Sequence, residues 1–464
     1  MRDGDILRQN KVANPLKKLL TKIKQISDQL KRNEYISNVV TLITGTTLSQ
    51  IIIIAVTPIL SRLYSPADYG TLALYSSIIS ILGVISCGRY EFAIVVPDND
   101  EESISLLFIS LILGIIVGLL ILIIIIILKP LIPRWTHSPD LDNWIWLIPA
   151  NIIVLSIFQA LTYWNIRKNN YKLLSKRRVN QSVSTVMIQV CSSVFKLVES
   201  GLIIGYLLGQ CIASITLLTQ TIKILKNHIS LINIKNLFKI IKKYRKFPVY
   251  DSWPSLLDNL TIAMPVLFFN HFYGSSETGQ LSLTLSMLAI PSALIGTSVS
   301  QVYYQKLAAT KNESLKLSTI IEETLAGLLI ISICFCLIVV LLAPQLFPII
   351  FGSSWILAGQ FALILAPSIS LRFAVSPLST VFAVLDRLEV VAFWKVTAAI
   401  ITFSFLAVSI YFNSAIISIL FLSINDLLLY SFYLFLIFKV SNSKLSNSVN
   451  HSFFILKRGL SLIK

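Results

Sequence analysis

Several arginines and carboxylates of this chain lie inside long apolar stretches, where a charged side chain costs about 2.5–3.5 kcal/mol unless it is paired or faces water. Arg89 and Glu91 interrupt the stretch ISCGRYEFAIVV, and Arg372 lies in PSISLRFAVSP. Arg372 is therefore predicted to face a water-filled lumen, where it is available for an anionic ligand. The structural alternatives are that Arg89 extends to the membrane surface and that Arg372 forms an ion pair.

The spacing of Arg89 and Glu91 predicts that the two charges do not neutralise each other. On a continuous helix, side chains two residues apart point about 200° from one another. At least one of them must then face the protein interior or a water-filled cleft, so both are candidates for contact with the ligand.

Two further carboxylates are candidates for binding a coupling ion. Asp258 follows Asp251 by seven residues, so both lie on one face of a helix, about 10 Å apart. Asp426 lies in SINDLLLY, midway along another apolar stretch. Each could hold a proton or a sodium ion, or could pair with Arg372, and both roles stay open at this stage.

A stripe of polar residues runs along the segment NQSVSTVMIQVCSSVFK, residues 180–196. Its members recur at three- and four-residue steps: Gln181, Thr185, Gln189, Ser193 and Lys196. Such a stripe on a helix faces away from lipid, and water or a polar ligand is expected beside it. Gln189 and Lys196 are therefore predicted to contact substrate, with a structural pair between Lys196 and Glu199 as the alternative for Lys196.

Other chemistry is not indicated by the residues. The five cysteines lie in apolar runs and the four histidines are scattered, so neither a metal site nor a cofactor is predicted. No Walker A motif occurs, so no ATPase is built in. The segment 129–143 is the longest loop predicted on the outer side, and it is too short for a catalytic domain. We therefore expect a protein that is not an enzyme.

The elements that position these residues are predicted to be membrane-spanning helices. The chain is 55% hydrophobic and only 13% charged, which is too apolar for a soluble protein of 464 residues. Uncharged runs of about 20 residues are long enough to cross the bilayer core. We expect an all-α polytopic protein with twelve spans, at 36–60, 70–94, 103–128, 144–166, 179–198, 200–224, 250–272, 278–303, 320–343, 356–382, 390–411 and 414–438.

The basic residues predict how the chain is oriented. Most of the 39 Lys and Arg residues fall on one side of a twelve-span topology, the side that also holds both termini. Cytoplasmic loops carry this excess, so both termini are expected in the cytoplasm. The net charge of +17 is explained in the same way, and no nucleic acid is expected as a partner.

The chain divides into two lobes of six helices. The predicted parts are a basic cytoplasmic segment 1–35, an N-terminal lobe 36–224, a basic cytoplasmic linker 225–249, a C-terminal lobe 250–438 and a basic cytoplasmic tail 439–464. The starts of the two lobes are weakly alike: TPILSRLYSPADYG ends at Gly70, and MPVLFFNHFYGSSETG ends at Gly279. This pattern is typical of the parallel repeats in some transporters.

Five stretches resemble bacterial polysaccharide flippases of the multidrug/oligosaccharidyl-lipid/polysaccharide exporter superfamily. They are RLYSPADYGTLALYSSI (62–78), GRYEFAIVVPDNDEE (88–102), YRKFPVYDSWPSLLDNLTIAMPVLFF (244–269), TGQLSLTLSMLAIPSALIGTSVSQVYYQ (278–305) and IIFGSSWILAGQFALILAP (349–367). The likeness covers most of residues 36–440. It implies two six-helix lobes around a central cavity, in which cations hold a diphosphate. By position, Arg89 corresponds to the arginine of the family's RYE-like stretch.

The resemblance also implies a function. Such a protein moves an undecaprenyl-diphosphate-linked oligosaccharide across the bacterial cytoplasmic membrane, from the inner to the outer leaflet, by alternating access. This step serves O-antigen, capsule or exopolysaccharide synthesis. Membrane lipids, a proton or sodium ion and other polysaccharide-assembly proteins are the expected partners.

Three other functions make different demands on the sequence. A drug/cation antiporter of the same superfamily would need an acidic cavity. A membrane-embedded polysaccharide polymerase or ligase would need a large outer loop. A scaffold would not need charges inside the membrane.

Overall fold

The computed structural model describes residues 34–129, 139–195, 198–228, 234–310, 314–448 and 450–451, and these form α-helices with short 3-10 and π segments and no strand. The helices of the first half of the chain are α2 (Glu34–Leu63), α3 (Pro66–Ser86), α4 (Tyr90–Ala93), α5 (Asp100–Leu128), α7 (Pro139–Trp144), α8 (Leu147–Arg167), α9 (Tyr171–Val194) and α10 (Val198–His228). The amphipathic helix α11 (Ile234–Lys243) follows.

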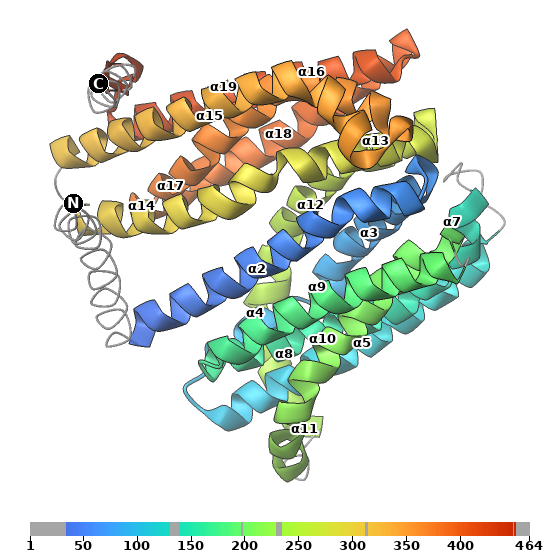
Figure 1. Cartoon of the computed structure of the whole chain (residues 1–464). Helices are drawn as coiled ribbons and strands as arrows, with labels where there is room; N and C mark the ends of the chain where they lie inside the picture. Colours follow the sequence, from blue (N-terminus) through green and yellow to red (C-terminus); the bar gives the residue numbers. More distant parts are fainter. Residues whose placement is uncertain are drawn as a thin grey trace, which may run out of the picture.

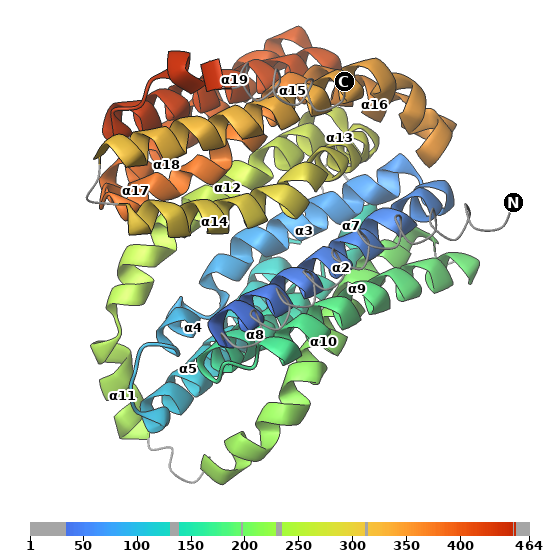
Figure 2. The ribbon, with the colours of Figure 1, turned by 60° about the vertical axis from the view of Figure 1, so that its left-hand side comes forward.

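The second half contains more interrupted helices. Its elements are α12 (Lys246–Tyr273), α13 (Ser275–Leu288), the π-helix η2 (Ser292–Gly296), α14 (Thr297–Ala309), α15 (Ser314–Phe351), η3 (Ser353–Trp355), α16 (Ile356–Val375), η4 (Ser376–Ser379), α17 (Thr380–Val384), α18 (Leu388–Ser409), η5 (Ile410–Phe412) and α19 (Ala415–Ser441). Figures 1 and 2 show two groups of long helices, α2–α10 and α12–α19, that lie side by side. The expected all-α membrane fold is confirmed.

Within the described residues, ten helices are long and apolar enough to cross a membrane. The expected number of twelve is not confirmed by this measure, because the fifth and seventh predicted spans do not qualify. These correspond to α9 and α12, which contain 24 and 28 residues. At about 1.5 Å of rise per residue both are long enough to span, so their polarity is what sets them apart.

The second predicted span, 70–94, is broken by the structure. Helix α3 begins with a reciprocal capping box between Ser65 and Asp68 and ends at Ser86. Gly88 and Arg89 then adopt left-handed backbone angles, with φ of 60° and 62°, before the short helix α4 begins. The expectation that Arg89 and Glu91 point apart is therefore wrong, because it assumed a continuous helix. Their side chains approach to 3.8 Å between Nη1 and Oε1.

The two halves touch closely at the end of the molecule where α7 lies, which we call the α7 end (right in Figure 1). Gly70 of α3 faces Gly279 of α13, the two glycines that close the similar stretches of sequence. A Cβ added at Gly70 would lie 3.0 Å from the backbone nitrogen of Gly279, and one at Gly279 would lie 2.9 Å from that of Gly70. Only glycine permits this approach, which brings the two similar stretches of sequence together.

Polar contacts reinforce the α7 end. The indole of Trp355 donates a hydrogen bond of 2.8 Å to the carbonyl of Ser61, whose hydroxyl donates to the carbonyl of Phe351 at 3.0 Å. Trp355 is fully buried and packs edge-on against Tyr69, with 5.0 Å between ring centroids. We call the opposite end, where α11 and α4 lie, the α11 end.

Candidate functional site

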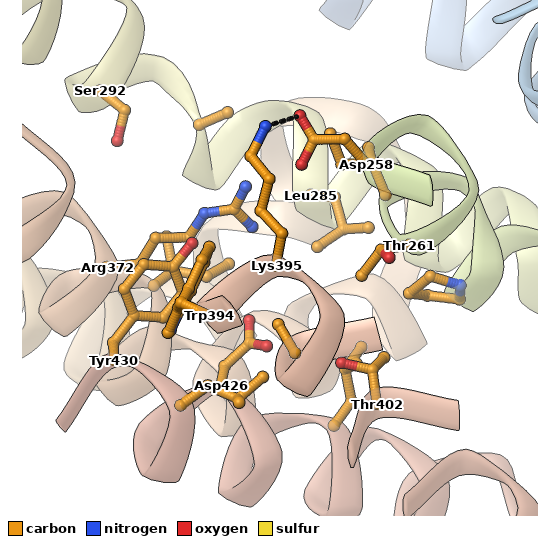
Figure 3. Close-up of a pocket in the computed structure, with 17 residues that line it drawn as sticks. Asp258, Thr261, Leu285, Ser292, Arg372, Trp394, Lys395, Thr402, Asp426 and Tyr430 are labelled. Atoms are coloured by element: carbon orange, nitrogen blue, oxygen red, sulfur yellow. Dashed lines mark hydrogen bonds and ion pairs between the residues drawn. The ribbon is translucent and has the colours of Figure 1, made fainter. Parts of the chain in front are cut away.

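A cavity of about 440 Å³ lies among α12, α13, η2, α16, α18 and α19, all in the second half of the chain. The charged and aromatic side chains that line it are Asp258, Arg372, Trp394, Lys395, Asp426 and Tyr430 (Figure 3). The volume is in the usual range for small-molecule sites. We refer to this space as the charged cavity.

Arg372 extends into the charged cavity from α16. Its guanidinium carbon lies 5.7 Å from the centre of the Tyr430 ring, a cation–π distance. The residue is exposed, and it forms no ion pair with any carboxylate in the part of the chain that the structure describes. An arginine that faces a cavity without an ion-pair partner is free to bind an anion.

Lys395 of α18 also lines the charged cavity and was missed as a site residue. Its Nζ lies 3.1 Å from Oδ2 of Asp258 on α12, and both side chains are partly exposed, at 32% and 42%. The signal that could have identified Lys395 is its place as a lone cation in the apolar run VVAFWKVTAAII.

Asp426 lies below Arg372 in Figure 3, on α19. Its Oδ1 accepts a hydrogen bond of 3.2 Å from the side-chain amide of Asn425, which also donates to the hydroxyl of Thr402 at 3.1 Å. The charged cavity thus contains two cations and two carboxylates. The formal charges cancel, which explains how four ionisable groups are tolerated at this depth of an apolar bundle.

Arg89 lies outside the charged cavity and joins the two halves at the α11 end. Its Nε donates to Oδ2 of Asp251 on α12 at 2.6 Å, and its Nη2 forms an ion pair with the same oxygen at 2.5 Å. Nη2 also donates to the hydroxyl of Ser255 at 2.7 Å, and the guanidinium carbon lies 4.3 Å from the centre of the Phe92 ring. Because the Arg89 side chain is only 12% exposed, it does not extend to the surface.

Glu91 is buried beside this contact between the halves. It is 1% exposed, and its Oε2 has no hydrogen-bond partner in the part of the chain described. Burial raises the pKa of Glu91 to about 7, an effect that Arg89 partly offsets and Asp251 adds to. Glu91 therefore titrates near neutral pH at a point where the two halves meet.

The polar stripe of the fifth predicted span packs against a helix rather than against water. Gln189 is buried, and its side-chain amide donates to the carbonyl of Leu202 on α10 at 3.1 Å. Gly205 and Gly209 of α10 face this side of α9, since a Cβ at Gly205 would lie 3.0 Å from the carbonyl oxygen of Thr185. Small residues at four-residue spacing allow such close helix packing.

The expected position of Gln189 beside a ligand is therefore corrected to a helix–helix contact. Lys196, the other predicted substrate contact of this stripe, lies outside the described residues. Of the seven predicted site residues, the structure brings Asp258, Arg372 and Asp426 together, places Arg89 and Glu91 between the halves, and separates Gln189 from both groups.

A family model described as "Polysaccharide biosynthesis protein" matches residues 59–359. The chain belongs to this family. Among curated proteins, none matches it in sequence.

Its fold is similar to that of solved transporters. The lipid II flippase MurJ, in an inward closed conformation, is 12% identical, with a TM-score of 0.70 over 92% of this chain and 93% of MurJ. An inward-facing multidrug resistance MATE transporter of the MOP superfamily is also 12% identical, with a TM-score of 0.59 over 87% and 96% of the two chains.

A third similar structure is a MOP superfamily transporter from Pyrococcus furiosus, described as having a binding pocket of reverse polarity. It is 12% identical, with a TM-score of 0.54 over 87% of this chain and 96% of that chain. At this identity the likeness establishes the fold. The chain is thus a multi-pass membrane protein with the fold of MOP superfamily transporters, as its sequence led us to expect.

Proposed function

We propose that this protein is a flippase that moves an undecaprenyl-diphosphate-linked oligosaccharide between the leaflets of the bacterial cytoplasmic membrane. The observation that carries the proposal is the charged cavity, in which Arg372 faces open space without a carboxylate partner and Lys395 lies within the same lining. Two cations on facing helices match the two phosphates of such a headgroup. Family membership supports a role in polysaccharide synthesis.

The charge balance suggests how the site takes up its ligand. The empty charged cavity is formally neutral because Asp258 and Asp426 balance Arg372 and Lys395. A diphosphate that binds Lys395 displaces Asp258 from their 3.1 Å ion pair and leaves both carboxylates without a compensating cation. Uptake of protons or sodium ions by these carboxylates would restore the balance. Binding of the anion and of a coupling cation would then favour each other.

Arg89 retains a predicted role in substrate contact, now at the entrance rather than inside. The carboxylate of Asp251 occupies the Nε–Nη2 edge of the guanidinium, which phosphate oxygens would use. An arriving headgroup can exchange with Asp251 and so release α12 from α4. The charged cavity then opens toward the α11 end, and the isoprenoid chain stays in lipid.

The orientation of the cycle follows from the basic residues. Those of the α8–α9 turn and of α11 lie at the α11 end, which we assign to the cytoplasm with both termini. Outward movement of a diphosphate is then favoured by the membrane potential, by about 2.3 kcal/mol per charge per 100 mV. A phosphatase or fluorescent reporter fused to the C-terminus tests this assignment.

Binding to the purified protein tests the proposal. Undecaprenyl diphosphate, inorganic diphosphate and an organic cation such as tetraphenylphosphonium are titrated in detergent. We expect saturable binding of the lipid diphosphate and a roughly 10–100-fold loss of affinity in Arg372→Ala, because a hydrogen bond to a charged group contributes about 1.5–3 kcal/mol. Arg387→Ala, at an exposed pair with Glu389 outside the cavity, is the matched control.

Transport in cells provides the second test. Deletion of the gene should trap the lipid-linked saccharide on the inner leaflet, and the Arg372→Ala protein should insert but fail to restore its export. Saturable binding of the organic cation in place of the diphosphate would contradict the proposal and favour a drug/cation antiporter, in which Asp258 and Asp426 are the binding groups.

A further inference from the structure

A second cavity, of about 390 Å³, adjoins the charged cavity and differs from it in chemistry. Four serines line it, together with Gly296, Phe373 and Pro377, and no charged side chain does: Ser292, Ser300, Ser376 and Ser379. It lies between the η2–α14 segment and the end of α16 with η4. We refer to it as the serine cavity.

The hydroxyl groups of the serine cavity are available to a ligand. Most serines inside the helices of this protein donate to a backbone carbonyl three or four residues earlier, as Ser110 and Ser156 do. The side-chain hydroxyls of Ser292, Ser300 and Ser376 make no hydrogen bond to another described residue. Ser376 is exposed and Ser292 and Ser300 are half-buried, so the three unpaired hydroxyls around this space are accessible to a ligand that displaces water.

The two cavities share a lining residue on one side, and on the other side they are lined by residues one helical turn apart. Ser292 lines both of them, and it is the first residue of the π-helix η2. On the facing side, Arg372 lines the charged cavity and Ser376 the serine cavity, one helical turn apart, with the backbone nitrogen of Ser376 bonded to the carbonyl of Arg372. Four residues of helix rise about 6 Å, so a ligand of two or three linked groups can occupy both.

The π-helix is an independent sign of a site at this junction. Such widened turns are rare and occur frequently at functional sites. Here Pro291 precedes the five residues Ser292–Gly296, and Gly296 at the end of the turn leaves the serine cavity open. A Cβ at Gly296 would lie 3.9 Å from Phe373 and from Ser292, so a side chain fits there but takes up cavity space.

We propose that the serine cavity is the saccharide subsite of the flippase, holding the sugar next to the diphosphate while Arg372 and Lys395 hold the phosphates. An uncharged cavity with free hydroxyls suits a neutral ligand rich in hydroxyl groups, and Phe373 supplies an apolar wall for the C–H face of a sugar ring. This assignment rests on the proposed function. It adds that the protein recognises the first sugar and not the lipid diphosphate alone.

The test compares probes with and without a sugar. The affinities for undecaprenyl diphosphate and for the same lipid bearing one N-acetylglucosamine or one galactose are measured on the purified protein. In the wild type, at least one sugar should increase the affinity. In the Ser300→Ala/Ser376→Ala variant, the increase in affinity that the sugar provides should fall about 10-fold, and the affinity for the sugar-free lipid should stay unchanged. Ser404→Ala, at an exposed serine on α18, is the control.

A second variant fills the serine cavity instead of removing hydroxyls. Gly296→Leu should abolish the gain from the sugar, whereas Gly327→Leu should not, because no atom lies within 4 Å of a Cβ at Gly327. Wild-type protein that binds all three lipids equally, or variants that weaken all three alike, would overturn the saccharide subsite while the flippase proposal stands. If no lipid diphosphate binds the wild type, both proposals fail.

Discussion

The contact of Arg89 with Asp251 should control how often the two halves separate at the α11 end. Asp251→Asn removes the negative charge and keeps the shape. A charge-assisted hydrogen bond at 2.6 Å and an ion-pair contact at 2.5 Å, both to Oδ2 of Asp251, would together contribute about 1.5–3 kcal/mol if buried. Because Asp251 is 46% exposed, solvent screening reduces this to about 1–2 kcal/mol. The population with this end open should then rise about 5–30-fold relative to the closed one.

Distances between spin labels can measure this shift. Val96, in the loop after α4, and Val249, on α12, are exposed and lie on opposite sides of the contact. The exposed and partly exposed native cysteines are replaced first, whereas Cys87 is fully buried and does not react. The Asp251→Asn protein should show a new population at longer distance, and Arg89→Asp combined with Asp251→Arg should reverse it.

The control for this experiment is Glu389→Gln, which removes a 3.5 Å ion pair that does not join the halves. An Asp251→Asn protein whose distance distribution matches the wild type would refute the reasoning, because the contact would then carry no preference between the two states.

Three further predictions concern stability. Folded Glu91 keeps its proton up to about pH 7, whereas the unfolded chain loses it near pH 4.5. The wild type should therefore lose up to about 3 kcal/mol of stability as the pH rises from about 4.5 to above 7, and Glu91→Gln should abolish this loss. The same change in melting temperature between pH 5 and pH 8 in the variant and the wild type would contradict this. Gly279→Leu should destabilise the protein by at least about 1–3 kcal/mol through collision with the backbone of α3, whereas Gly327→Leu should leave the melting temperature unchanged. Gln189→Leu should cost about 1 kcal/mol and leave ligand affinity unaltered, and a large loss of affinity in that variant would restore Gln189 to the binding site.

The sequence by itself determined that the protein lies in a lipid bilayer, which class of fold it has and which family it belongs to. In lipid, an apolar run of about 20 residues can satisfy its backbone hydrogen bonds only as a helix. The all-α membrane fold therefore followed from composition and length alone. The stretches around Gly70, Arg89 and Gly279 were specific enough to indicate the family, and the match over residues 59–359 confirms it. The boundaries of the predicted lobes stay predictions.

Only the tertiary structure decided which charges meet. Spacing along a helix says which residues share a face, but not which helix that face contacts. Thus the stripe with Gln189 meets the glycines of α10, and Lys395 joins Asp258 across 137 positions of sequence. The break at Gly88–Arg89 also escaped a prediction based on hydrophobicity, because two left-handed residues leave the apolar pattern unchanged while they turn Arg89 toward Asp251.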